Sequence, residues 1–291
     1  MIAAFATIYI VWGSTYLAIR VAVETLPPFL MAGCRFLVAG TALFTWLWLR
    51  GVALPDKIHW RNAAITGSLL LTGGNGLVVW SEQTVPSNLA ALLIALTPVW
   101  FALIDWLRPS GLRPRTQTVV GILVGLSGVV LLVSGPDTAL HNSGLNLSGA
   151  LALALAGLLW AGGSLFSRHS AHPRSPWMNA AAQMMCGGAG LMLLAVLTGE
   201  PGRVNKSHVS GQSLAALFYL IVFGSWIAYS AYIWLLKAST PARVATYAYV
   251  NPVIAVFLGR FILGELLNAR AIWAAMVIVA GVIVTTLPRR P

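Results

Sequence analysis

The sequence predicts an all-α integral membrane protein, with ten transmembrane helices arranged as two inverted five-helix repeats around a central cavity. Three observations support this. The 291 residues are 58% hydrophobic and only 9% charged, whereas a water-soluble domain carries about 25% charged residues. Ten apolar stretches are long enough to cross a bilayer. The second half of the chain repeats residues of the first half at a constant offset.

The apolar stretches are separated by short connections, so no soluble domain fits between them. A spanning helix needs about 20 predominantly apolar residues. The first stretch lacks a basic leader and is too long for the core of a signal peptide, so we expect it to remain as a membrane helix. The predicted helices cover residues 2–23, 29–49, 61–82, 87–107, 116–134, 147–167, 177–198, 213–236, 241–262 and 270–288.

An internal repeat divides the chain into two predicted units, residues 1–136 and 147–288. Each unit holds five helices, which is an odd number, so the second unit must cross the membrane in the opposite sense. Secondary transporters built from inverted repeats of this kind bind substrate near the bilayer midplane, between the halves. The repeat rests on pairs 148 positions apart: Trp12 and Trp160, Leu17 and Leu165, Arg20 and Arg168, and Pro28 and Pro176.

Basic residues indicate the orientation. With the N-terminus inside, 12 of the 18 Lys and Arg residues fall in cytoplasmic loops or the C-terminal tail. This bias follows the positive-inside rule and predicts that both termini are cytoplasmic. Because these charges lie between apolar runs, they indicate topology and argue against a nucleic-acid partner. Cys34 and Cys186 lie inside apolar runs, which favours neither a disulfide nor a metal site.

Ionisable groups are missing from the predicted membrane midplane. All seven acids and all five histidines fall in loops or near helix ends, whereas proton-coupled pumps use buried carboxylates or histidine relays. We therefore expect a neutral cavity, with flux that follows the substrate gradient. Arg35 is the deepest basic residue, and two interpretations stay open: a structural residue that reaches the outer surface and faces Glu24 or Glu82, or a partner for a substrate carboxylate. The sequence also lacks the nucleophile–base pair or metal set of an enzyme, which predicts no catalytic residues, metal or cofactor.

Helix breaks at corresponding places in the two halves point to a transporter site. Glycines interrupt the third and eighth predicted helices, and a proline removes a backbone hydrogen bond inside a helix. Close helix contact is the alternative explanation for such small residues, and Gly121 and Gly125 in the fifth helix fit it. The predicted breaks or gating positions are Gly73, Gly74, Gly76, Pro98, Gly224 and Pro252.

Aromatic and neutral polar side chains near mid-helix are the candidate lining of the cavity. An indole or phenol face binds flat groups, and hydroxyls and amides bind charged ends of a solute by hydrogen bonds. Packing against neighbouring helices stays open as the alternative for each aromatic. The candidate substrate-binding residues are Trp12, Ser14, Asn75, Trp80, Thr97, Trp100, Trp160, Ser164, Trp226, Tyr229, Tyr249 and Asn251.

Four short stretches, two near each end of the sequence, carry a family resemblance. The run from Leu258 to Glu265 with the later 281–284, and the early 11–14 with 28–36, resemble the last two and first two helices of EamA-type transporters, in the drug/metabolite transporter superfamily. The resemblance implies inverted five-helix repeats that move amino acids or other small metabolites outward across the bacterial inner membrane by alternating access. In the first repeat, residues 108–111 replace the Gly-Glu turn that the family often has.

The expected partners are a small-molecule substrate and the lipid bilayer, with the chain a monomer or a weak homodimer. The lining favours a zwitterionic or neutral substrate with an apolar or aromatic body, and an amino acid fits this description. The alternative cargo is a flat organic cation, such as a quaternary ammonium compound, held by cation–π contacts. A receptor or scaffold is a further alternative that flux measurements would reject.

Overall fold

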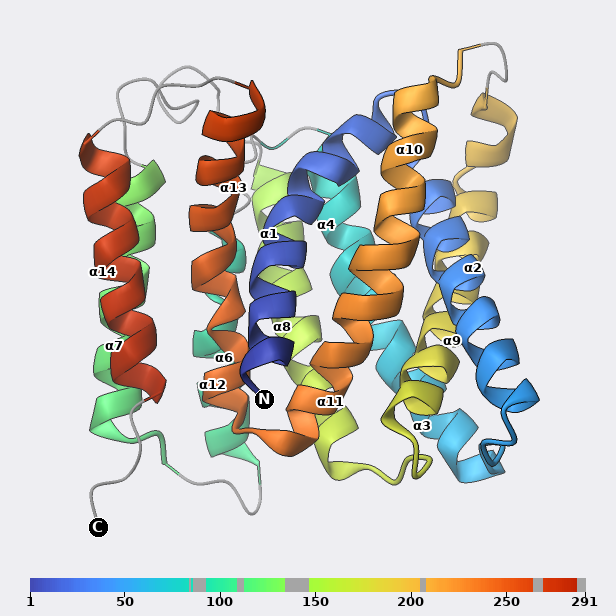
Figure 1. Ribbon diagram of the computed structural model, residues 1–291, viewed down its shortest axis with the longest axis horizontal. Helices are drawn as coiled ribbons and strands as arrows, with labels where there is room; N and C mark the ends of the chain where they lie inside the picture. Colours follow the sequence, from blue (N-terminus) through green and yellow to red (C-terminus); the bar gives the residue numbers. More distant parts are fainter. Residues whose placement is uncertain are drawn as a thin grey trace.

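The computed structural model describes residues 1–83, 85, 93–108, 113–133, 147–204, 208–263 and 269–286. All regular structure within these ranges is helical. The long helices form an upright bundle, in which α1 begins and α14 ends at the same, lower end (Figure 1). Six described segments are long and apolar enough to cross a membrane. The predicted all-helical character is thus confirmed for this part of the chain.

Four of these six segments are uninterrupted α-helices: α1 (Ile2–Val23), α2 (Pro28–Leu49), α8 (Leu147–His169) and α9 (Pro176–Leu197). The ends of α2 and α9 are built alike. Each begins with a proline, whose fixed φ suits a first helical turn. After each helix a glycine takes positive φ, 75° at Gly51 and 71° at Gly199, a conformation that usually ends a helix.

The other two long segments contain a wider, π-helical middle. The first runs through α3 (Lys57–Gly67), η1 (Ser68–Asn75) and α4 (Gly76–Ser81), and the second runs through α10 (Gly211–Tyr219), η3 (Leu220–Tyr229) and α11 (Ser230–Ala238). Here the sequence prediction needs correction, because the glycines of these segments do not break the helix. They lie in or beside turns that widen while the helix continues, a feature often found at functional sites.

The remaining elements are α6 (Thr97–Leu107), α7 (Thr116–Val133), the short η2 (Glu200–Arg203), α12 (Pro241–Ala245), α13 (Tyr247–Leu263) and α14 (Ala269–Thr286). Pro98 lies in the first turn of α6, where no backbone hydrogen bond is lost, so its predicted role inside a helix is wrong. Pro252 does lie inside α13. Residues 87–92 of the predicted helix 87–107, and parts of 108–111 and 258–265, lie outside the described residues.

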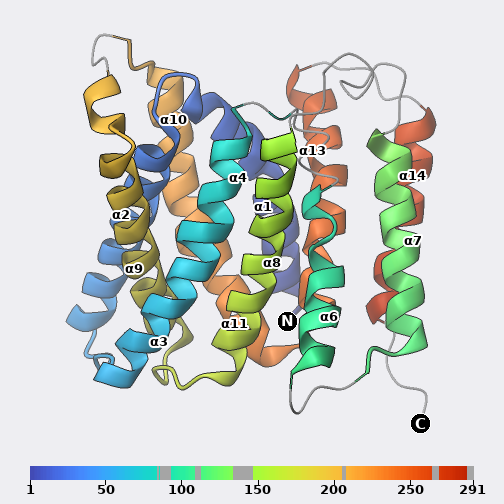
Figure 2. The same ribbon diagram turned by 180° about the vertical axis from the view of Figure 1, so that it is seen from behind.

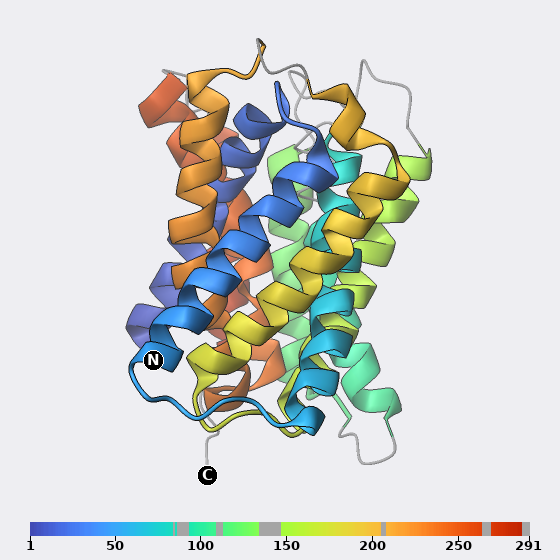
Figure 3. The ribbon, with the colours of Figure 1, turned by 90° about the vertical axis from the view of Figure 1, so that its right-hand side faces the viewer.

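Helix packing joins the two halves of the chain. α2 packs against α9 at one side of the bundle and α7 against α14 at the other (Figures 1 and 2). Seen from the side, α2 and α9 run obliquely beside each other (Figure 3). Between these outer pairs, α1 contacts α10, η3 and α13, while α8 contacts η1, α4 and α6. Each of these two inner helices therefore packs mainly on helices of the other half.

Glycines allow the outer pairs to approach closely. A Cβ atom on Gly281 would lie 2.5 Å from the backbone N of Gly125, and one on Gly188 would lie 2.8 Å from the backbone N of Leu37. In lipid, where hydrophobic burial does not drive helix association, such small residues permit close backbone contact. The close contact predicted for Gly121 and Gly125 is thus present within the chain, between α7 and α14. Large apolar side chains such as Trp48, 55% exposed, cover outer helix faces, as expected of surfaces that face lipid.

Candidate functional site

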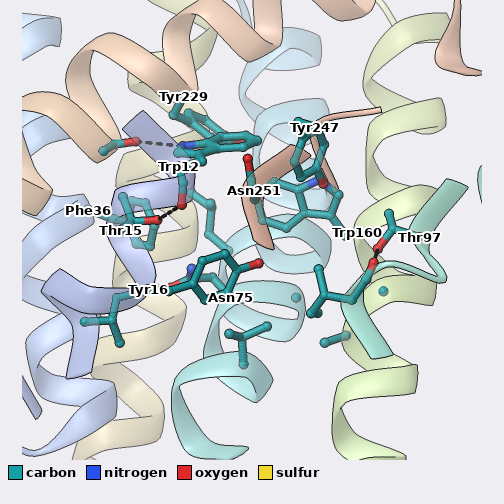
Figure 4. Close-up of a pocket in the computed structure, with 18 of the residues that line it drawn as sticks. Trp12, Thr15, Tyr16, Phe36, Asn75, Thr97, Trp160, Tyr229, Tyr247 and Asn251 are labelled. Atoms are coloured by element: carbon teal, nitrogen blue, oxygen red, sulfur yellow. Dashed lines mark hydrogen bonds between the residues drawn. The ribbon is translucent and has the colours of Figure 1, made fainter. Parts of the chain in front are cut away.

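A cavity lies between α1, α2, the two π-helical segments, α6, α8 and α13. It offers about 80 Å³ to the centres of water-sized molecules, which is room for several waters or for part of a small solute. Both polar and aromatic side chains point into it (Figure 4). Its lining is Trp12, Thr15, Tyr16, Ile19, Arg35, Phe36, Leu71, Gly74, Asn75, Val78, Ile94, Thr97, Ala156, Gly157, Trp160, Gly224, Tyr229, Tyr247 and Asn251.

Aromatic rings gather on the side of the cavity toward the end of the bundle where α1 begins. Trp12 and Trp160, the pair that marks the repeat, meet edge to face with ring centroids 5.6 Å apart. Tyr232 and Tyr247 lie 4.9 Å and 5.0 Å from Trp12 by the same measure. Such edge-to-face and tilted contacts add stability beyond area burial. These four rings form what we call the aromatic floor.

Hydrogen bonds fix the floor from within. The indole N–H of Trp160 donates to the Tyr232 hydroxyl at 2.8 Å, and that hydroxyl also bonds Ser164 Oγ at 2.5 Å. The indole N–H of Trp12 donates to the carbonyl oxygen of Gly224 at 3.2 Å. The indole N–H groups of both tryptophans are therefore satisfied by the protein, so a solute would meet only the ring atoms that border the cavity.

A buried polar network holds Tyr229 in a comparable way. Its hydroxyl donates to Gln183 Oε1 at 2.8 Å. The Gln183 amide in turn donates to Ser167 Oγ at 3.2 Å and to Asn179 Oδ1 at 3.1 Å. All four side chains are buried, where unmade hydrogen bonds are costly. The network therefore fixes the Tyr229 ring against the cavity and leaves its hydroxyl little freedom to reach a ligand.

Arg35 brings a positive charge to the cavity wall, and this corrects the expectation of a neutral cavity. Its side chain is 4% exposed, so it does not reach the outer surface. Nε donates to Ser225 Oγ at 2.7 Å, and the guanidinium carbon lies 4.7 Å from the centre of the Phe36 ring. Nη1 is buried without a hydrogen-bond partner, which is unfavourable in a closed protein unless an acceptor arrives.

A carboxylate accompanies this arginine. Glu82, which follows α4, interacts electrostatically with Arg35 and with Arg20. One of its oxygens, Oε2, has no hydrogen-bond partner. The sequence placed Glu82 at a helix end, and the structure shows that this helix end lies beside the charged wall of the cavity.

The neutral polar side chains of the lining differ in whether their hydrogen-bonding atoms already have a partner within the protein. The Thr97 hydroxyl donates to the carbonyl of Ile94 at 2.6 Å. The Asn251 amide, in the orientation that satisfies its neighbours, donates to the carbonyls of Tyr247 at 3.0 Å and Tyr9 at 3.3 Å. Asn75 Oδ1, by contrast, is buried without a partner. It is an acceptor available to an N–H group of a solute.

Two glycines of the π-helical segments make room for these groups. A Cβ on Gly224 would lie 2.8 Å from Nη2 of Arg35, and a Cβ on Gly74 would lie 3.0 Å from Cε3 of Trp160. Side chains at these positions would push the guanidinium and the indole out of place. The glycines thus act as spacers beside the cavity and not as breaks.

The structure brings together eight of the predicted site and gating residues. These line the cavity: Trp12, Asn75, Thr97, Trp160, Tyr229, Asn251, Gly74 and Gly224. Whether they bind substrate stays a prediction. The other ten do not line it: Ser14, Trp80, Trp100, Ser164, Trp226, Tyr249, Gly73, Gly76, Pro98 and Pro252.

Each of those aromatics and hydroxyls has another contact that explains its position. Trp80 is 36% exposed, Trp226 packs on the apolar core, and Trp100 lies against α8 at Gly157. Tyr249 faces the other way along α13, toward Gly125 of α7. Ser14 forms a hydrogen bond with the Tyr219 hydroxyl at 2.5 Å. Ser164 forms one with the hydroxyl of Tyr232 in the aromatic floor.

The predicted glycines and prolines that do not line the cavity have other places in the fold. A Cβ on Gly73 would lie 2.7 Å from Cδ1 of Leu159 in α8, and a Cβ on Gly76 would lie 3.0 Å from Cδ2 of Leu191 in α9. Pro98 begins α6. Pro252 is buried within α13 away from the cavity lining, although it does free the carbonyl four residues earlier.

Sequence reasoning missed several lining residues, and helical spacing could have found most of them. Thr15, Tyr16 and Ile19 follow Trp12 by three, four and seven positions, so all four share one face of α1. Tyr247 precedes Asn251 by four positions in the same way. Phe36 had no such signal, because it is set by how α2 leans on the bundle.

The comparisons with known proteins agree with this architecture. The model of the EamA-like transporter family matches residues 1–134 and 147–287. The uncharacterized inner membrane transporter YedA of Escherichia coli (strain K12) is 41% identical over 290 residues, covering 98% of this chain and 90% of that protein. Protein PecM of Dickeya dadantii is 27% identical over 280 residues, with 94% and 89% covered. A solved crystal structure, 21% identical, superposes with a TM-score of 0.77 over 98% of this chain and 95% of that one.

Proposed function

The chain belongs to the EamA-like transporter family, and from that premise we propose that it exports small carboxylated metabolites across the bacterial inner membrane. The favoured cargo is an amino acid with an aromatic or apolar side chain. The protein acts as a transporter and not as an enzyme, and it needs no cofactor. The observation that carries the proposal is the buried Arg35 guanidinium, whose Nη1 lacks a partner at the wall of an aromatic cavity.

The proposed architecture is two inverted five-helix repeats, residues 1–136 and 147–288, with both termini cytoplasmic. Reciprocal packing supports it, because α1 lies on the π-containing segment of the second half and α8 lies on that of the first. The matched helix ends at Gly51 and Gly199, 148 positions apart, support it further. A site between such halves is where secondary transporters hold their substrates.

Three parts of the cavity suit the three parts of an amino acid. The guanidinium of Arg35 pairs with the carboxylate, since arginine presents several N–H donors in a planar fork. The unpartnered Oδ1 of Asn75 accepts from the ammonium group. The faces of Trp12 and Trp160 cover the apolar or aromatic side chain. The first two contacts satisfy buried polar atoms that have no hydrogen-bond partner within the protein.

Alternating access requires the aromatic floor to open. In the present state the floor lies on the side of the cavity toward the end where α1 begins, which is the cytoplasmic end in the proposed orientation. The π-helical segments flank the cavity, and turns of this kind are frequently found at functional sites. Cargo enters when the floor parts and leaves from the opposite side when it closes. We expect flux to follow the substrate gradient, although Glu82 beside Arg35 is the group to examine if a proton gradient proves necessary.

Organic cations are the competing cargo, and Arg35 argues against them. A fixed positive charge in a site shielded from water repels a second cation. The aromatic rings alone would accept such a compound by cation–π contacts. The discrimination between the two cargoes therefore rests on the guanidinium.

Transport in liposomes tests the proposal. Purified protein is reconstituted without any pH or ion gradient, and entry of labelled phenylalanine is followed with unlabelled competitors. We expect gradient-driven flux that leucine and tryptophan inhibit, while phenylalanine amide and a quaternary ammonium compound do not. Flux inhibited by the ammonium compound but not by amino acids would overturn the cargo proposed here. Flux seen only with an imposed gradient would overturn uncoupled transport.

A further inference from the structure

A second hollow lies at the end of the bundle where α1 begins, between α6, α7, α8, α12 and α14. It offers about 520 Å³ to the centres of water-sized molecules, more than the central cavity does. Among the described residues, none lines both hollows, so the two are separate sites. We call the second one the basic basin, because its wall carries Arg108, Arg113, Arg115, Arg168 and Arg243.

The charged side chains that line the basin are predominantly positive. Five guanidinium groups face one carboxylate in this lining, that of Asp105, which leaves four positive charges in excess. Asp105 Oδ1 is 2.9 Å from Arg108 Nε, so the single acid is already engaged. Arg168 is held in place by the backbone, since its Nη1 donates to the carbonyls of Leu236 and Ser239. A group of fixed positive charges of this kind attracts an oxyanion with several acceptor oxygens.

The helices that border the basin carry the signs of a membrane interface. On α6, Trp106 is 44% exposed and Leu107 is 72% exposed. Tryptophan gathers at the level of lipid headgroups. The Arg113 guanidinium carbon lies 5.9 Å from the centre of the Trp106 ring, which places a basin arginine at that level. On α7, Val120 is 44% exposed and continues an apolar surface beside the basin. Charge and lipid-facing surface therefore meet at one place.

We propose that the basic basin binds the phosphate headgroup of an anionic phospholipid, such as phosphatidylglycerol or cardiolipin. Basic pockets between membrane helices on the cytoplasmic side bind anionic headgroups in this way. The arginines take the phosphate, and the exposed apolar faces of α6 and α7 take the beginnings of the acyl chains. The proposal is independent of the cargo of the central cavity.

Lipid retention tests this site directly. The full-length protein is purified in detergent, supplied with equal amounts of phosphatidylglycerol and phosphatidylcholine, and bound lipid is counted by native mass spectrometry. The test variant is Arg113→Gln with Arg115→Gln, which leaves the Arg168 and Arg108 contacts intact. The matched control is Arg50→Gln with Arg61→Gln, which removes the same charge at the same end of the bundle but outside the basin. Circular dichroism melting verifies that both variants fold.

The expected result is preferential retention of phosphatidylglycerol by the wild type and by the control. Removal of the two basin arginines weakens this binding by about 30-fold, since each basic residue near a membrane surface contributes roughly a fivefold factor. Equal losses in the two variants would show general charge attraction and overturn the site. A third arm adds inorganic phosphate. Displacement of the lipid at equimolar inorganic phosphate, with the same dependence on Arg113 and Arg115, would show a free-phosphate site and overturn the lipid proposal.

Discussion

The central cavity and the basic basin both use arginine, in opposite ways. The cavity has one guanidinium that is 4% exposed, with Ser225 as its hydrogen-bond partner and Glu82 nearby. The basin has five, and the side chain of Arg108 there is 30% exposed. A charge interaction strengthens several-fold as water is excluded. One buried arginine can therefore decide cargo selection, whereas the basin needs several to hold a headgroup at the edge of the membrane.

The largest effect is expected where a single charge carries recognition. Arg35→Gln should reduce binding of a carboxylated cargo by about 30-fold or more, because removing one partner of a buried, hydrogen-bonded charge pair costs about 2 kcal/mol or more. Flux of labelled phenylalanine into liposomes measures it. Arg35→Lys should recover only part of the loss, because lysine lacks the planar fork. Unchanged flux in Arg35→Gln would place recognition elsewhere and would remove the contrast between the two sites.

The aromatic floor should matter less than the charge above it. Trp160→Leu removes an indole face and its hydrogen bond to Tyr232, and about a tenfold loss of transport is expected, since aromatic contacts of this type contribute about 0.5–1.5 kcal/mol beyond burial. Trp80→Leu is the control, because Trp80 is a half-exposed tryptophan away from the lining. Resistance of cells to toxic aromatic amino-acid analogues provides the measurement. Equal protection by the wild type and Trp160→Leu would argue against an aromatic contact.

A screening experiment compares the two sites in one preparation. Raising the salt from 0.1 M to 1 M shortens the Debye length from about 10 Å to about 3 Å. Retention of phosphatidylglycerol at the basin should fall by about fivefold, while inhibition of flux by leucine should change by less than about twofold, because buried charges are screened less. A cavity as salt-sensitive as the basin would contradict the burial of Arg35 during binding.

The smallest effect on cargo affinity is expected from filling the space beside the Arg35 guanidinium. Gly224→Ala places a methyl group where a Cβ would be 2.8 Å from Arg35 Nη2, so the side chain must shift, and about a threefold weaker affinity for amino acids is expected from a partly misaligned charged hydrogen bond. Gly162→Ala in α8 is the matched control, since a Cβ there meets nothing within 4 Å. Competition curves for leucine distinguish them. Identical curves for both variants would show that Gly224 sets no spacing.

The helices were predictable because their signal lies in the composition of each segment. Long apolar runs and the prolines at 28 and 176 mark α2 and α9 within a residue of their observed ends. The π-helical turns were not predictable in kind, since glycines at 73–76 indicate a local irregularity without saying whether the helix breaks or widens. The fate of Pro98 depended on where α6 begins, and helix starts are set by tertiary contacts as much as by sequence.

The site was predictable where a residue and its helical neighbours share one face. Trp12, Trp160 and Asn251 project into the cavity, as mid-helix polar and aromatic residues in a bundle tend to do. Tyr249 was misplaced because it stands two positions from Asn251, which turns it to the opposite side of α13. Arg35 was the larger miss. Its position along α2 fits either the surface or the interior, and only the packing of α2 on η3, beside Ser225, decides between them.

The wide turns at 68–75 and 220–229 have a consequence for how the chain tolerates change. A π-helical turn closes its hydrogen bonds over five residues where an α-helix uses four, so it accommodates an inserted amino acid without breaking the rod. Deleting one residue such as Thr72 would let ordinary α-helical winding resume with little rotation of the helix that follows. The change would be confined to the turn itself, where Gly74 and Asn75 line the cavity. Loss of a wide turn would therefore alter the cavity wall locally, while the rest of the helix would keep the same face toward the bundle.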